Sequence, residues 1–205
     1  MQRSDLKQEE YQNLLDRIVP IILKKGLKSA TMDTVAAQLG MSKRTLYEIF
    51  GSKSEMLKEV LGAMEKKNHE FFTEAFRNSD NVMEAFIKVL EHNRDIMREV
   101  NVDFYRDMDR LYKERREDYD RARECRYGVM QQMFQLGVEQ GMFRPDVDHY
   151  VQSRLMGLQM EALKRIEELF PPGITLQRVF DNIIIGFLRS IASEKGMRVL
   201  DNLRY

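Results

Sequence analysis

Apolar side chains recur at three- and four-residue spacing along most of this 205-residue chain. That spacing is typical of amphipathic helices, and no stretch shows the strict alternation of a half-buried strand. The chain has only four prolines and no tryptophan, so few residues interrupt the helical pattern. The sequence therefore predicts an all-α protein, long enough to bury a real core within one or two domains.

Two long helices are expected to frame the first third of the chain. The first covers about 5–25 and ends at Gly26, a usual C-terminal cap residue. The other covers about 54–77, and Ser52 with Glu55 three residues later forms the capping-box pattern at its start.

Two short helices are expected between them, over 32–39 and 43–50, with Thr31 and Ser42 as N-caps. Gly40 supplies the turn that joins them. Two short helices braced by a longer one form a helix-turn-helix, whose second helix fits the major groove of DNA.

The second short helix carries more polar side chains than a core helix needs. If Leu46 and Phe50 rest on the scaffold, the outward-facing residues are Lys43, Arg44, Thr45, Tyr47 and Glu48. Lysine and arginine donate to guanine acceptors, threonine contacts base edges or thymine methyl groups, and a tyrosine hydroxyl reaches phosphate. The alternative is an ordinary polar helix facing solvent.

Charge at this end of the chain is compatible with a polyanionic partner. Residues 24–53 contain six Lys/Arg and two Asp/Glu, although the whole chain has a formal net charge of zero. Lys53 lies near the start of a long helix, where an ammonium and exposed backbone N–H groups together suit a phosphate.

Segment 26–57 resembles the DNA-binding domain of the TetR family of transcriptional regulators. The order and spacing of the matching residues are specific, and the remainder of the chain resembles the family only in length, helicity and layout. The matching residues are Gly26, Thr31, Val35, Ala36, Leu39, Gly40, Met41, Ser42, Thr45, Leu46, Tyr47, Phe50, Ser52, Lys53, Ser54, Glu55, Met56 and Leu57.

The resemblance implies a homodimeric, repressor-like protein that leaves a palindromic operator when a small molecule binds its second domain. It also implies a helix-turn-helix domain over 1–53 and a helical ligand-binding and dimerisation domain over 54–205. By position, it implies recognition-helix contacts from Lys43, Arg44, Thr45 and Tyr47, and phosphate contacts from Thr31, Ser42 and Lys53.

Two positions depart from the family pattern. Arg44 stands where the family often has a small residue, and Glu48 where it often has an aromatic, histidine or neutral residue. Arg44 can contact guanine and Glu48 can accept from a cytosine amino group. Alternatively, Glu48 pairs with Lys43 or Arg44 and only orients that cation.

The rest of the chain is expected to form further helices over about 81–100, 102–113, 114–140, 146–170 and from 175 onward, with a polar, mobile tail from 195. Asp146 is the expected cap of the helix over 146–170. Methionines and aromatics are frequent in this part. Eight of them are candidates to line an apolar ligand cavity, or are simply core: Phe86, Met97, Phe104, Met108, Tyr112, Met130, Phe134 and Met160.

The last two long helices carry apolar stripes wide enough to be buried on two sides. They either complete a four-helix bundle with a second copy or pack only within the chain, and the family layout favours the dimer. The candidate interface residues are Val151, Leu155, Leu158, Ala162, Ile166, Phe180, Ile183 and Phe187.

Nothing in the sequence suggests catalysis. We find no nucleophile motif, no Gly-rich phosphate loop and no metal-ligand spacing, so we expect no enzyme activity, metal site or cofactor. Without a visible leader or a bilayer-length apolar run, and with Cys125 as the single cysteine, we expect a cytoplasmic protein. The competing interpretations are a helical protein that uses the same scaffold for a protein partner, and a ligand carrier or enzyme built on the C-terminal bundle.

Overall fold

The computed structural model describes residues 7–114 and 116–202, and the side chains of these residues except 109–123, 125 and 126. Tyr112 and Cys125 therefore lie outside the described side chains. In the described part of the chain every regular element is a helix. The described residues also contain an isolated β-bridge between Phe143 and Ala192. The predicted all-α fold is confirmed. None of the helices described is both long and apolar enough to cross a membrane.

The chain divides into two compact units. One contains the residues up to Glu70 together with Glu99–Met108, and the other contains Phe71–Arg98 and the residues from Asp109 onward. The two units are defined by which residues pack together. The functional boundary expected between residues 53 and 54, which separates DNA binding from ligand binding, therefore stays a prediction.

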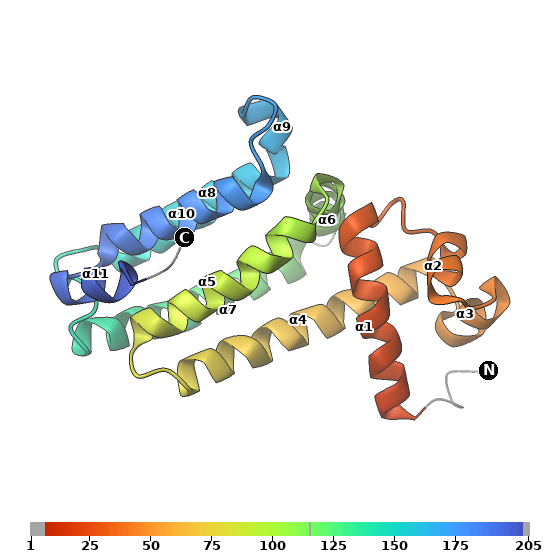
Figure 1. Ribbon diagram of the computed structural model, residues 1–205, viewed down its shortest axis with the longest axis horizontal. Helices are drawn as coiled ribbons and strands as arrows, with labels where there is room; N and C mark the ends of the chain where they lie inside the picture. Colours follow the sequence, from red (N-terminus) through yellow and green to blue (C-terminus); the bar gives the residue numbers. More distant parts are fainter. Residues whose placement is uncertain (1–6, 115, 203–205) are drawn as a thin grey trace. The chain divides into compact units, whose positions relative to one another are not determined.

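The first unit begins with four helices: α1 (Gln8–Lys25), α2 (Met32–Leu39), α3 (Lys43–Phe50) and α4 (Lys53–Arg77), the last of which continues into the second unit (Figure 1). The bounds of α2 and α3 are those predicted. Thr31 Oγ1 accepts from Thr34 N at 3.1 Å, and Ser42 Oγ accepts from Thr45 N at 3.0 Å. Both hydroxyls therefore act as N-caps, which fixes where the two helices begin.

The turn between α2 and α3 depends on Gly40. Its φ of 69° is left-handed, a conformation that costs other residues more than glycine. Its N–H closes the end of α2 by bonding to Ala36 O and Ala37 O. The predicted glycine turn is confirmed.

Apolar residues from all four helices form the core of the first unit. Six of them are completely buried: Ile18, Ile22, Val35, Leu46, Met56 and Val60. Burial of a leucine- or isoleucine-sized side chain stabilises a fold by roughly 1.5–3 kcal/mol. This core holds α3 in a fixed orientation.

The segment Glu99–Met108 packs on the first unit and contains the start of α6 (Val102–Glu114). Asn101 N donates to Leu23 O at 2.8 Å, and Lys24 Nζ pairs with Glu99 at 2.8 Å. These contacts join the residues just before α6 to the end of α1.

The second unit contains α5 (Val82–Glu99, up to Arg98), α7 (Arg116–Glu139), α8 (His149–Glu161), a 3-10 turn (Ala162–Arg165), α9 (Ile166–Leu169), α10 (Leu176–Ile191) and α11 (Glu194–Leu200). In Figure 1, α10 runs beside α8, and these two helices share many contacts. Phe86, Phe134, Phe143 and Phe187 form its central aromatic cluster, with neighbouring ring centroids 5.7–6.3 Å apart.

Two predictions about this unit are wrong. Asp146 does not cap the helix expected over 146–170, because its carboxylate pairs with Arg144 at 3.0 Å and Asp148 Oδ1 accepts from Val151 N instead. That helix ends at Glu161 and gives way to the 3-10 turn and α9.

The tail is also not a mobile polar segment as far as Asn202. It forms α11, capped by Ser193 Oγ, which accepts from Gly196 N at 3.1 Å. Leu200 is completely buried. A Cβ at Gly196 would stand only 2.1 Å from Met142 O, so glycine permits this close packing.

Candidate nucleic-acid interface

Helix α3 has one buried face and one exposed face. Leu46, Ile49 and Phe50 are 0–6% exposed, and the Phe50 ring lies 5.8 Å from that of Tyr11 on α1. The opposite face presents Lys43, Arg44, Tyr47 and Glu48 to solvent, with Tyr47 42% exposed. Since the apolar side anchors the helix, its polar side is free to enter a DNA groove.

Two ion pairs hold the cations of this exposed face. Lys43 Nζ lies 2.8 Å from Asp33 Oδ2 of α2, and this hydrogen bond raises the pKa of Lys43. Arg44 Nε lies 2.9 Å from Glu48 Oε1, one turn further along α3, and the Arg44 hydrogen bond lowers the pKa of Glu48. Glu48 thus pairs with Arg44, one of the two interpretations open from the sequence.

The Lys43–Asp33 pair was not expected, although Asp33 in the first turn of α2 is an acidic residue facing the start of α3. Exposed pairs of this kind are weak and are screened by salt. Phosphates or base acceptors can therefore replace Asp33 and Glu48 as partners without a large change in structure.

The remaining predicted DNA contacts lie at the starts of helices. Thr31 and Ser42 are exposed, and their hydroxyls cap α2 and α3. Thr45 is half-buried, and its hydroxyl lies 2.8 Å from Ser42 Oγ. The cap residues place the free N–H groups of two helix ends at the surface, where such groups suit phosphate oxygens.

Lys53 already has a partner inside the protein. Its Nζ donates to Lys28 O at 2.7 Å, and Lys28 N donates to Asp107 Oδ2 of α6 at 2.7 Å. Partial burial lowers the pKa of Lys53, and the charge of Asp107 raises it. To make the predicted phosphate contact, the Lys53 ammonium must therefore donate to Lys28 O and to a phosphate at the same time, or give up its bond to Lys28 O.

A further bracing residue was not anticipated. Arg17 Nη2 of α1 donates to Leu39 O at 3.0 Å, where it satisfies a carbonyl at the end of α2. A basic residue near a helix C-terminus is a recognised stabiliser, but the sequence separation of 22 residues conceals the contact.

The described candidate cavity residues are divided between the two units. Phe104 and Met108 belong to the first unit, and the other described candidates to the second. Phe86, Met97, Phe104 and Phe134 are 1–8% exposed and form part of the cores. The half-buried candidates are Met108, Met130 and Met160.

A groove of about 690 Å³ lies between α8 and α10. Its walls are mainly apolar, and it contains none of the candidate cavity residues. The lining residues are Gln152, Leu155, Met156, Gln159, Phe170, Ile174, Arg178, Val179, Asn182, Ile183, Gly186, Phe187 and Ser190.

The candidate dimer residues separate into two groups. Val151, Leu155 and Leu158 of α8 are 46%, 46% and 68% exposed, which is unusual for large apolar side chains. The core group is Ile166, Phe180 and Phe187, each 5–6% exposed within one chain, whereas Ala162 and Ile183 are half-buried. An interface on this face would thus be built mainly from α8.

No group of three metal-ligating side chains occurs in the described ranges. The structure instead presents a helix-turn-helix with a polar, exposed second helix. This arrangement defines a DNA-binding protein of the helix-turn-helix class.

The comparisons with known proteins specify the class further. Residues 14–60 match the family profile described as bacterial regulatory proteins, tetR family. No curated protein is similar enough in sequence to count as a match.

Solved structures similar to this chain include the TetR-family transcriptional regulator PfmR from Thermus thermophilus. It is 26% identical, with 86% of this chain and 97% of that chain covered and a TM-score of 0.56. The ketosteroid transcriptional regulator KstR2 of Mycobacterium tuberculosis is 22% identical, with 92% and 98% covered and a TM-score of 0.58. A Saccharomonospora viridis protein described as a transcriptional regulator, solved with choline, is 17% identical, with 91% and 100% covered and a TM-score of 0.66.

Residues 14–60 are therefore identified as the DNA-binding domain of the TetR family of bacterial regulatory proteins, and most of the chain has the fold of a TetR-family transcriptional regulator. The resemblance found in segment 26–57 is confirmed. Members of the family regulate transcription rather than catalyse a reaction, and this confirms the expectation that the chain is not an enzyme.

Proposed function

We propose that the chain is an operator-binding repressor whose affinity for DNA changes when a small molecule binds its second unit. The observation that carries this proposal is the two-faced helix α3, with Leu46 and Phe50 buried and Lys43, Arg44 and Tyr47 exposed. Such a helix can enter a major groove without disturbing the core that holds it.

We further propose that two copies act together. Leu155 and Leu158 expose large apolar surfaces on α8, beside the groove that α8 forms with α10. A second copy packed on this face would cover apolar surface that is otherwise in water. A twofold dimer places two α3 helices on successive major grooves, so the operator would be roughly palindromic.

The effector is proposed to be small and apolar or amphipathic. The second unit is rich in aromatic and methionine side chains, which suit such a ligand. The Saccharomonospora viridis protein of similar fold was solved in complex with choline, so a protein of this fold can bind a small organic molecule. A regulator of this kind would act in the cytoplasm, where the bacterial chromosome lies.

The salt dependence of DNA binding tests the central part of the proposal. Neutralised phosphates release counterions, so the affinity for duplex DNA should fall steeply between about 50 and 200 mM salt. Fluorescence anisotropy of a labelled duplex measures this directly. A folded protein that binds no duplex at low salt would favour the rival function, a helix-turn-helix scaffold that contacts a protein partner.

A further inference from the structure

Arg94 of α5 is a charged residue set in the interior of the second unit. Only 9% of the residue is exposed, and its neighbours at one-turn spacing on α5, Leu90 and Met97, are 1% and 8% exposed. A cation in such a place is costly unless its donors are satisfied.

One internal contact satisfies part of this requirement. Arg94 Nε donates to Asp181 Oδ1 of α10 at 2.9 Å, and both side chains are largely buried. Guanidinium has five N–H donors, and paired carboxylates commonly bind two of its nitrogens at once. Here the carboxylate bonds only Nε.

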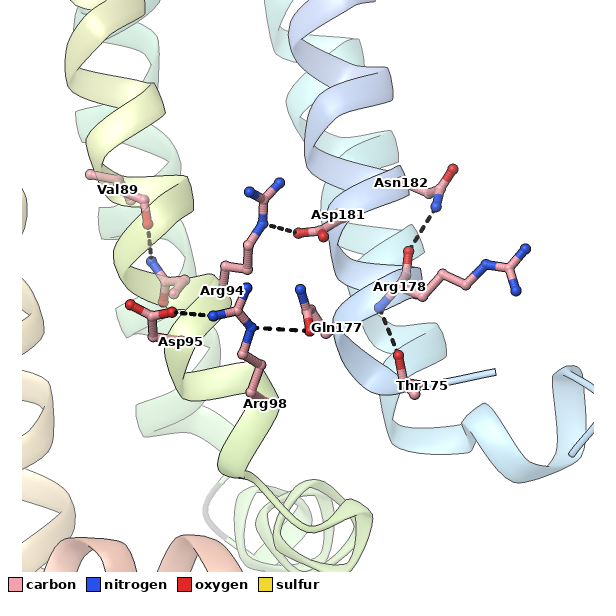
Figure 2. Close-up of polar contacts among 10 residues, drawn as sticks. Val89, Arg94, Asp95, Arg98, Thr175, Gln177, Arg178, Asp181 and Asn182 are labelled. Atoms are coloured by element: carbon pink, nitrogen blue, oxygen red, sulfur yellow. Dashed lines mark hydrogen bonds and ion pairs between the residues drawn. The ribbon is translucent and has the colours of Figure 1, made fainter. Parts of the chain in front are cut away.

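The two terminal nitrogens of Arg94 bond to none of the residues that the structure describes. They are also not sealed from solvent. Figure 2 shows them directed away from the contact with Asp181, between α5 and α10. They therefore form an accessible donor pair, with the geometry that matches a carboxylate or phosphate.

The polar groups around Arg94 do not fill this position. Arg98, one turn along α5, donates to Asp95 at 3.0 Å and to Gln177 Oε1 of α10 at 3.4 Å (Figure 2). The bond from Arg98 engages the side-chain oxygen of Gln177. The side-chain NH2 group of Gln177 has no partner in the described part of the chain. A second donor is thus available beside Arg94.

We propose that Arg94 is the anchor for an organic anion, a carboxylate or phosphate monoester with an apolar body, and that this anion is the effector class. The inference rests on the proposed effector-controlled function. The anion bonds to the two terminal nitrogens while Asp181 keeps Nε. An apolar body suits the two neighbours of Arg94 at one-turn spacing on α5, Leu90 and Met97, which are apolar and buried. The charge of Asp181 repels the anion and thereby limits its affinity.

Isothermal titration calorimetry of the full chain with three probes, below their micelle-forming concentrations, tests the proposal. Decanoate and decyl phosphate carry the two headgroup chemistries, and decanol carries the same chain without charge. We expect at least one of the anions to bind at least tenfold more tightly than decanol. Equal affinities for all three, or no binding of any, would overturn the proposal.

Variants separate an anchor from a structural ion pair. Arg94→Gln should reduce the anion affinity to that of decanol, whereas the control Arg198→Gln, on the surface of α11, should not. Asp181→Asn should raise the anion affinity several-fold, because the competing charge is lost. If both Arg94→Gln and Asp181→Asn lower the melting temperature and leave the affinities unchanged, the pair is only structural. If Arg94→Gln does not fold, the proposal is still tested by the preference of the wild type for the anions over decanol and by the anion affinity of Asp181→Asn.

DNA binding by the same proteins distinguishes this inference from the function on which it rests. Wild type and Arg94→Gln should bind the same duplex equally, and only wild type should respond to the anion. A wild type that binds no DNA contradicts the proposed function. A wild type that binds DNA but has the same anion affinity as Arg94→Gln contradicts only the anchor.

Discussion

Arg44 Nε lies 2.9 Å from Glu48 Oε1 on the exposed face of α3. The contact uses one nitrogen of the guanidinium, and Arg44 remains 89% exposed. The two terminal nitrogens of Arg44 can therefore face a base edge while Nε stays bonded to Glu48. This geometry suits bidentate donation to guanine O6 and N7.

Arg44→Ala should accordingly relax the preference for one base pair in each half-site, by about 1–3 kcal/mol. Binding to sequences with other bases at that position should change much less. Selection of random duplexes with both proteins measures the preference at every position.

Glu48→Gln is the matched variant, since it keeps the size of the side chain and removes its charge. Binding to unrelated DNA should rise, because one repulsion from phosphates is lost, while the preference at the Arg44 position should weaken. An unchanged profile in Arg44→Ala would mean that Arg44 contacts the DNA backbone or serves only Glu48.

Lys53→Ala should weaken binding to all duplexes about equally, because a phosphate contact carries no base information. The slope of log affinity against log salt should fall by about one. Lys66→Ala is the control, since Lys66 is an exposed lysine about 20 Å further along α4.

The internal bond from Lys53 to Lys28 O adds a second effect of this substitution. A melting curve of Lys53→Ala shows whether the loss of this bond destabilises the first unit. A shift in operator preference at unchanged stability would show that Lys53 does not act through phosphate.

Leu158→Glu should dissociate the proposed dimer. Leu158 is 68% exposed within one chain, so the substitution spares the fold but places a charge in the α8 interface. We expect the dimer dissociation constant to rise by about tenfold or more, a loss of at least 1.4 kcal/mol. Sedimentation velocity over a range of concentrations measures it.

Leu136→Glu provides the control for that experiment, because Leu136 is a 38% exposed leucine on another helix, α7. If Leu158→Glu and wild type show the same dissociation constant, the dimer uses another surface.

His149 should make the protein less stable in acid. Its Nε2 is buried without a hydrogen-bond partner among the described residues, and its ring lies 5.4 Å from that of Phe134. Burial lowers the pKa of His149 below its ordinary value, 6.5, more than its bond to the Arg144 backbone and the charges of Asp148 and Asp146 raise it. Below about pH 6.5 the unfolded chain therefore binds the proton more readily, and stability falls until the folded form also titrates.

The melting temperature of wild type should consequently drop further between pH 7.5 and 5.5 than that of His149→Gln. His69→Gln, which removes an exposed imidazole on α4, should behave like wild type. Equal drops in wild type and His149→Gln would assign the acid sensitivity to other groups.

The sequence predicted α2 and α3 well because local contacts determine them. The Thr31 and Ser42 caps and the Gly40 turn lie within a few residues of the helix ends that they define. The same logic failed at Asp146, where two acidic residues stand close together and Arg144 engages the first of them. Composition alone could not show which carboxylate caps the helix.

Contacts between distant residues account for the other differences. Leu200 is buried although charged residues such as Lys195, Arg198 and Asp201 stand close to it in the sequence, so α11 was mistaken for a mobile tail. Arg94 and Asp181 are 87 residues apart, and their contact has no local signature. The sequence nevertheless contained one detectable sign, because Arg94 interrupts the apolar stripe to which Leu90 and Met97 belong.

Selection of random duplex DNA on the purified protein, sequenced at near-physiological salt, would show whether α3 reads an operator. We expect a palindromic motif with half-sites about 10 base pairs apart. No enrichment by a folded, dimeric protein, with or without decanoate, would contradict the assignment of α3 as an operator-binding helix.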